Sequence, residues 1–194
     1  MKRFKHPQNP LHLIGRGVQI ADEHLPVRIG GDAALLQGFA KTMLSQGGFD
    51  SEFISNNTLG FEDWKRHIES TDWETIVEQS GISRDRIEKT GTAIARSKRM
   101  IVCWAMGLTQ HENSVAVIQE VSNLLLAGGH FGKPGAGACP VRGHSNVQGD
   151  RTVGINHHPT EDFISSCENE TGIKMPRKKG YDVVEFIQAA LQAV

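Results

Sequence analysis

Residues 100–128 read MIVCWAMGLTQHENSVAVIQEVSNLLLAG, and this stretch decides the fold class. It opens with a short continuous apolar run at residues 100–105, which is typical of a strand in a sheet covered on both faces. Gly107 ends the run, and a helix is predicted over residues 113–127. The expected inner face of that helix comprises Val115, Ile118, Val121 and Leu125. Because another helix is predicted upstream, the order helix, strand, turn, helix indicates an α/β fold with parallel strands.

The N-terminal part of the chain carries weaker patterns. Residues 1–24 contain several Pro and Gly residues and no sustained period, so we expect them to be irregular. Residues 25–29 are a candidate for a short strand, and the glycine pair after them predicts a turn. Asp32 can cap a helix that extends to about Ser45. The expected buried face of this helix comprises Ala33, Leu36, Phe39, Ala40 and Met43.

A run of short helices is predicted next, at residues 51–57, 61–70 and 73–79, with Gly81 ending the last one. Ser83 can cap a further helix, whose inner face is marked by Ile87, Thr90 and Ile94. Aromatic side chains at this spacing are typical of a core rather than of a stacking platform. The aromatic residues concerned are Phe53, Phe61, Trp64 and Trp73.

Residues 128–154 break the helical pattern, with eight glycines, two prolines and several polar side chains. Glycine permits close approach of the backbone to a ligand, and exposed N–H groups can form anion-binding nests. Arg142 offers a planar fork of donors that suits a phosphate or a carboxylate. Polar partners for a heterocycle with mixed edges are available in His144, Asn146 and Gln148. From the residues alone, a ligand-binding loop and an ordinary surface loop are equally compatible with this composition.

A second candidate site lies where the strand at residues 100–105 ends. Ligands of open α/β sheets bind outside the carboxyl ends of the strands. The backbone of Gly107 and the side chain of Gln110 are therefore candidate ligand contacts, and a plain tight turn is the alternative.

Three familiar motifs are excluded by spacing: a phosphate-cradling Walker loop, a dinucleotide fingerprint and a compact zinc site.

Composition limits the class of protein. The chain has 194 residues and a net charge of −1, so nucleic acid is not an expected partner. Three widely spaced cysteines are not a disulfide framework, which favours a reducing compartment. No apolar run is long enough to span a membrane, and the N-terminus has no signal-peptide pattern, so a cytoplasmic location is expected.

A last helix, capped by Asp182, is predicted at residues 183–193.

Three pieces of sequence carry a resemblance to a known family: MGLTQ at residues 106–110, LLLAGGHFGKPGAG at residues 124–137 and PVRGHSNVQG at residues 140–149. In this order they resemble the molybdopterin oxidoreductases of the dimethyl sulfoxide reductase superfamily. Within it, they are most similar to formate dehydrogenase alpha subunits and their formate-dehydrogenase-like relatives. The resemblance covers roughly residues 20–155. It implies a parallel-sheet, Rossmann-like domain of that type over residues 1–144, and part of a second α/β domain over residues 145–194.

The resemblance also implies an enzyme whose bis-molybdopterin guanine dinucleotide cofactor holds molybdenum or tungsten. It places Gly107 and Gln110 near one pterin. It implies that Arg142 is the active-site arginine that steers a small anion such as formate. It also implies that His144 takes part in polar contacts or in proton movement. Both residues would belong to the cofactor pocket. Typical formate dehydrogenases have Gln where His144 stands, although the formate-dehydrogenase-like relatives carry His. Further implied pocket residues are Asn146, Gln148 and Gly149.

The resemblance finally implies what this chain lacks. The chain has no four-cysteine motif for an iron–sulfur cluster. It also has no metal ligand, so the family's metal ligand is expected in a preceding segment. The chain is expected to be an internal fragment that is inactive alone and works with the other domains of a parent enzyme and an electron acceptor. Two alternatives remain: a non-catalytic module that binds a pterin or nucleotide, and a structural remnant.

Overall fold

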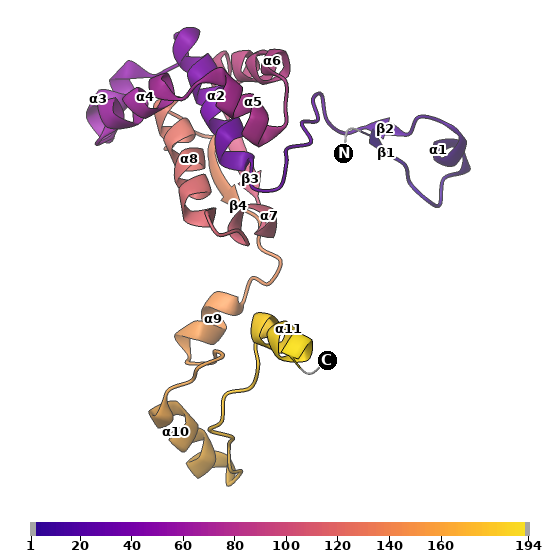
Figure 1. Cartoon of the computed structure of the whole chain (residues 1–194), viewed down its shortest axis with the longest axis vertical. Coiled ribbons are helices and arrows are strands. Elements are labelled where there is room, and N and C mark those ends of the chain that lie inside the picture. The colour runs from indigo at the N-terminus through magenta and orange to yellow at the C-terminus, as the bar shows by residue number, and fades with distance from the viewer. Residues whose placement is uncertain (1–2, 193–194) are drawn as a thin grey trace. The chain divides into compact units, whose positions relative to one another are not determined.

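The computed structural model describes residues 3–192 and divides the chain into two compact units, Met1–Val141 and Arg142–Val194. The first unit contains most of the helices and both small sheets (Figure 1). Its larger helices are α2 (Asp32–Ser45), α3 (Ser51–Asn57), α4 (Phe61–Ser70), α5 (Trp73–Ser80), α6 (Arg84–Ala95) and α8 (Ser114–Ala127). These bounds confirm the predicted helices to within a residue or two, but the predicted cap of α2 is wrong, because Gly31 is its N-cap residue and Asp32 is its first helical residue.

Helix α2 lies at the centre of the first unit and packs against α4, α5, α6 and α8 (Figure 1). Close approach of α2 to α5 and α6 depends on Gly38, where an added Cβ would lie 2.7 Å from Ile87 and 3.0 Å from Ile76. Partly buried Trp64 and Trp73 pack against the core, as predicted. The buried cluster itself comprises Phe39, Ala40, Met43, Ile68, Ile76, Ile82, Ile87 and Leu124.

Strand β3 (Ile101–Trp104) pairs in parallel with β4 (Gly137–Pro140), which confirms the prediction of an α/β fold with parallel strands. The observed fold is rich in helices, and its sheets are small. The prediction that this sheet is covered on both faces is wrong, because β3 alternates between exposed and half-buried residues. This sheet has two strands within the described residues, and Ile101, Cys103 and Cys139 in it are exposed. Val115, expected on the inner face of α8, is 71% exposed, whereas Val117 and Leu124 are buried there.

The N-terminal segment is more regular than the sequence predicts. Strands β1 (Arg3–Phe4) and β2 (Val18–Gln19) pair antiparallel around helix α1 (Pro10–Ile14). The strand predicted at residues 25–29 is absent from the described structure. The Arg28 amide instead donates to the Ser80 carbonyl at 2.9 Å, and the Arg28 guanidinium donates to the Glu78 carbonyl at 2.7 Å. This segment is therefore held by the end of α5.

The second unit contains α9 (Val147–Thr152), α10 (Glu161–Thr171) and α11 (Val183–Gln192). Asp182 caps α11 as predicted, since its carboxylate accepts from the Glu185 amide at 2.9 Å, and Ala193 lies outside the described residues. The sequence missed α9 and β4, which interrupt the predicted irregular stretch, and it missed α10. Within its described residues this unit has no buried side chain. None of the described helices of either unit has the length and hydropathy of a membrane span.

Candidate site at the carboxyl ends of the parallel strands

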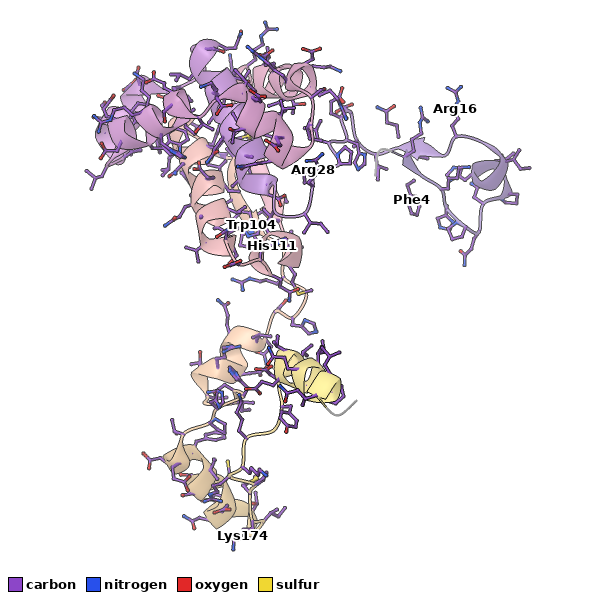
Figure 2. The ribbon with its side chains drawn as sticks, viewed as in Figure 1. Phe4, Arg16, Arg28, Trp104, His111 and Lys174 are labelled. Atoms are coloured by element: carbon purple, nitrogen blue, oxygen red, sulfur yellow. The ribbon has the colours of Figure 1, made fainter. Side chains whose placement is uncertain are left out.

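Both candidate segments follow the carboxyl ends of the parallel strand pair. The short helix α7 (Met106–Thr109) comes directly after β3, and its position is marked by Trp104 before it and His111 after it (Figure 2). The strand pairing continues past β4, because the Val141 amide donates to the Trp104 carbonyl at 2.7 Å. Arg142, the first residue of the second unit, comes next in the chain. This edge is where open parallel sheets place their ligands.

Gly107 and Gln110 lie together in the turn formed by α7. Both are exposed, and an added Cβ on Gly107 would meet no atom within 4 Å. The Gln110 amide N–H closes the turn on the Met106 carbonyl at 3.0 Å, and its side-chain nitrogen lies 3.6 Å from the Met106 sulfur. The Gln110 side-chain oxygen therefore remains available as an acceptor, and the Gly107 backbone is open to a flat ligand.

Arg142 is exposed, and it forms no hydrogen bond or ion pair with the residues that the structure describes. Arg177 in the same unit differs, because the carboxylates of Glu161 and Glu168 bind its guanidinium. An unpaired guanidinium is free to bind an anion through two parallel N–H donors. His144 is also exposed, and its carbonyl accepts from the Val147 amide at 3.3 Å at the start of α9.

The other predicted pocket residues belong to the start of α9. Asn146 is the N-cap residue, and its amide nitrogen donates to the Asp150 carboxylate at 3.1 Å. A Cβ on Gly149 would lie 2.5 Å from the Asn146 side-chain oxygen, so glycine makes room for this amide. The Gln148 side chain is exposed. The second unit thus presents a guanidinium, an imidazole and amides within one short segment.

The structure therefore groups the predicted residues into two sets, Gly107 with Gln110 in the first unit and residues 142–149 in the second. The second set by itself offers charged donors, neutral donors and acceptors, which is the chemistry that a polar heterocycle with a phosphate requires. Within the described residues no group of three or more His, Cys, Asp or Glu side chains could hold a metal ion.

One polar cluster in the first unit was not predicted from the sequence, because its members are far apart in the chain. The buried His130 side chain lies beside Gly128, and its Nδ1 has no hydrogen-bond partner among the described residues. The Asp50 carboxylate accepts from the Phe53 amide at 2.9 Å and lies 3.3 Å from the Lys133 amine. The bond from the Phe53 amide lowers the pKa of Asp50, while burial lowers the pKa of His130.

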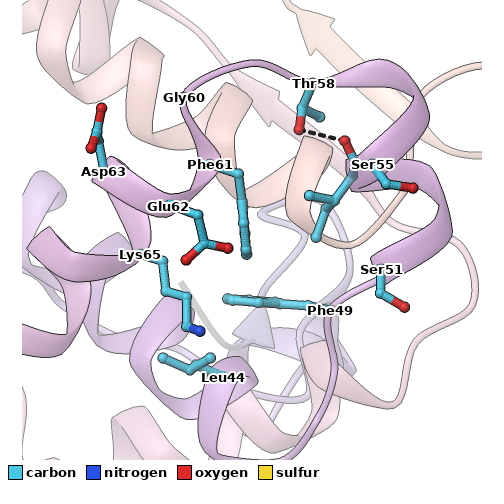
Figure 3. A pocket seen from close by; sticks show the side chains of 11 residues that line it. Leu44, Phe49, Ser51, Ser55, Thr58, Gly60, Phe61, Glu62, Asp63 and Lys65 are labelled. Carbon is cyan, nitrogen blue, oxygen red and sulfur yellow. Dashed lines mark hydrogen bonds between the residues drawn. The ribbon is translucent and has the colours of Figure 1, made fainter.

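A pocket of about 570 Å³ lies beside α3 and α4 (Figure 3). Phe49 and Phe61 form much of its wall, with ring centroids 5.7 Å apart. Thr58 closes the end of α3 by donating its hydroxyl to the Ile54 carbonyl at 2.8 Å. None of the residues named by the sequence as site candidates lines this pocket.

The chain resembles known proteins over most of its length. The family model described as molybdopterin oxidoreductase matches residues 1–191. An uncharacterized oxidoreductase of Mycobacterium bovis is 42% identical over 193 residues, which cover 96% of this chain and 25% of that protein. Protein YdeP of Escherichia coli is 39% identical, with 97% of this chain and 26% of YdeP covered.

More distant relatives have named activities. Formate dehydrogenase H of Escherichia coli is 28% identical, over 87% of this chain and 25% of the enzyme. Among solved structures, acetylene hydratase from Pelobacter acetylenicus matches with a TM-score of 0.57 and 28% identity. That match covers 60% of this chain and 16% of the hydratase. The chain thus spans about a quarter of the length of the Mycobacterium bovis oxidoreductase, of YdeP and of formate dehydrogenase H.

Proposed function

The chain belongs to the molybdopterin oxidoreductase family, and from this premise we propose that it supplies part of the cofactor and small-anion site of a formate-dehydrogenase-like enzyme. Family membership implies a molybdopterin cofactor with molybdenum or tungsten; the proposal adds that this cofactor is the bis-guanine dinucleotide form. When bound, such a group supplies two-electron redox chemistry at its metal. The single observation that carries the proposal is the exposed guanidinium of Arg142, two residues after the end of β4, which is unpaired among the described residues.

We assign separate tasks to the two sets of residues. Gly107 offers unobstructed backbone and Gln110 a free side-chain oxygen, so they bind one face and edge of a pterin. Arg142 binds a small carboxylate such as formate and orients it, because two N–H donors fix both oxygens while the carbon stays free. His144 holds or moves a proton beside that anion. The cofactor contacts of the second unit extend along Asn146, Gln148 and Gly149.

The proposal extends to the parent enzyme. Residues 1–144 belong to a Rossmann-like cofactor-binding domain and residues 145–194 to a neighbouring α/β domain. Other domains supply the metal ligand, and a separate protein or cofactor accepts the electrons. We place this enzyme in the cytoplasm. The 194-residue chain is catalytically silent by itself, because no metal ligand is assigned within it.

Binding of extracted molybdopterin guanine dinucleotide to the 194-residue chain tests the proposal by titration calorimetry. Arg142 also lies in the proposed cofactor pocket, where its guanidinium suits a phosphate of the guanine dinucleotide, so its replacement with alanine is expected to weaken cofactor binding roughly tenfold or more, because one hydrogen-bonded charge contributes about 1.5–3 kcal/mol. Arg151→Ala is the matched control, since Arg151 is an exposed arginine on α9 outside the predicted set. Equal affinities of R142A and R151A, or no binding heat with the unaltered chain, would count against the proposal.

A separate experiment tests whether the chain alone lacks catalytic activity. Viologen-linked formate oxidation is assayed with the purified chain after incubation with the same cofactor extract. We expect no turnover above a heat-denatured control. Robust formate oxidation that depends on added molybdenum would show that this chain contains a metal ligand of its own.

A further inference from the structure

The parallel sheet brings two cysteines from distant parts of the sequence into register. Cys103 of β3 is paired with Cys139 of β4, and both side chains are free and exposed. The third cysteine, Cys167, is half-buried in α10 of the second unit. Sequence spacing gives no sign of this pairing, because the two cysteines belong to different strands separated by the whole of α8.

The geometry of a parallel strand pair suits a bond between these residues. Neighbouring strands lie roughly 4.8 Å apart, and disulfides join Cα atoms roughly 4.4–6.8 Å apart. Register partners on adjacent strands also direct their side chains to the same face of the sheet. A hydrogen bond between the two thiols, followed by desolvation and repulsion between the sulfurs, raises the pKa of Cys103. Because the two residues are register partners, their thiols lie side by side on one face of the sheet.

We propose that Cys103 and Cys139 form a reversible disulfide that links β3 to β4. The oxidant is a low-molecular-weight disulfide of the glutathione class. One cysteine thiolate attacks a sulfur of the small disulfide, which forms a mixed disulfide and releases one small thiol. The second cysteine thiolate then attacks the cysteine sulfur of the mixed disulfide and releases the other small thiol. Two electrons and two protons pass from the protein dithiol to the small disulfide.

The position of this bridge gives it a consequence for the sheet. Cys103 lies just before the α7 turn, and Cys139 lies two residues before Val141, whose amide donates to Trp104. A bridge here locks the pairing of the only two strands that the described parallel sheet contains. Exposed disulfides are the ones that small thiols reduce readily, so the bridge responds to the redox state of its surroundings.

The test is equilibration of the native 194-residue chain with defined mixtures of oxidised and reduced glutathione. Free thiols are then alkylated, and the digested chain is mapped by mass spectrometry. We expect the free thiols to fall from three to one, with Cys103 linked to Cys139 and Cys167 alkylated. Dithiothreitol should restore all three. Cys167→Ser should leave the linkage intact, whereas C103S and C139S should each abolish it.

A denatured sample separates the effect of the fold from that of chain proximity. Cys139 is closer in sequence to Cys167 than to Cys103, and shorter loops close at lower entropic cost. In concentrated guanidinium chloride we therefore expect the Cys139–Cys167 linkage to exceed the Cys103–Cys139 linkage. If the native chain gives this same distribution, or yields only glutathione adducts or linked dimers, the proposal is wrong.

Discussion

The Trp64 indole N–H donates a hydrogen bond of 2.9 Å to the Glu120 carboxylate, which joins α4 to α8. The other carboxylate oxygen lies 3.5 Å from the Gln37 amide nitrogen of α2. Glu120→Ala leaves the indole N–H without this acceptor, and we expect the free energy of unfolding to fall by about 1–3 kcal/mol. Urea denaturation measures the change. Gln119→Ala, at an exposed position of the same helix, is the control, and equal losses would contradict the prediction.

Gly91 of α6 sets the distance between α6 and α2. An added Cβ would lie 2.6 Å from the Thr42 Cβ, and both residues are buried. We expect Gly91→Ala to lower the free energy of unfolding by about 1–3 kcal/mol, because overpacking outweighs the helix propensity gained. Gly107→Ala is the control, since its Cβ would meet open space. Thermal or urea unfolding compares the two, and a G91A variant as stable as G107A would refute the close-packing argument.

The helices of the first unit could be predicted because their signals are local. Asp50 and Asp72 accept from backbone amides at the starts of α3 and α5, and Gly81 takes a left-handed conformation at the end of α5. Caps and periodicity of this kind depend on a few neighbouring residues. Which hydrophobic residue is buried depends on tertiary packing instead. Val115 has the right spacing for the inner face of α8 and is nevertheless exposed.

In the candidate site too, local features could be predicted from the sequence and long-range contacts could not. Gly107 and Gln110 could be placed at a strand end because the apolar run before them is local and clear. The register that pairs Cys103 with Cys139, and the meeting of Asp50 with His130, join residues far apart in the chain, so no spacing rule predicts them. The α10 helix was missed because the sequence around it is polar, although the Thr160 hydroxyl accepts from the Phe163 amide at 3.3 Å as a local cap.

His130 should make the first unit less stable in mild acid. Burial, followed by the charge of Lys133, lowers its pKa below the ordinary 6.5, and Asp50 opposes this shift. As the pH falls below 6.5, the unfolded chain therefore takes up a proton before the folded one does. The stabilising contribution is complete above 6.5 and is lost as the pH falls toward the folded-state pKa.

A non-titrating replacement tests this dependence. His130→Gln should flatten the change in unfolding free energy between neutral and mildly acidic pH, measured by urea denaturation at several pH values. The lowered pKa of Asp50 keeps that carboxylate ionised across this range. Gln119→Ala, at an exposed position of α8, should retain the slope of the unaltered chain. The same slope in H130Q would mean that another group is responsible.

Arg177 should hold the segment after α10 in place. Its Nη2 donates to the Glu161 and Glu168 carboxylates at 2.8 Å each, and its Nη1 donates to the Met175 carbonyl at 3.1 Å. Arg177→Ala should speed amide exchange over residues 173–178, measured by hydrogen-exchange mass spectrometry. Arg177→Lys should restore little protection, because an ammonium group lacks the planar fork that reaches both carboxylates. Since exposed ion pairs are screened by salt, added salt should reduce the difference between the variants and the unaltered chain. Full protection in R177A at low salt would show that backbone bonds alone hold this segment.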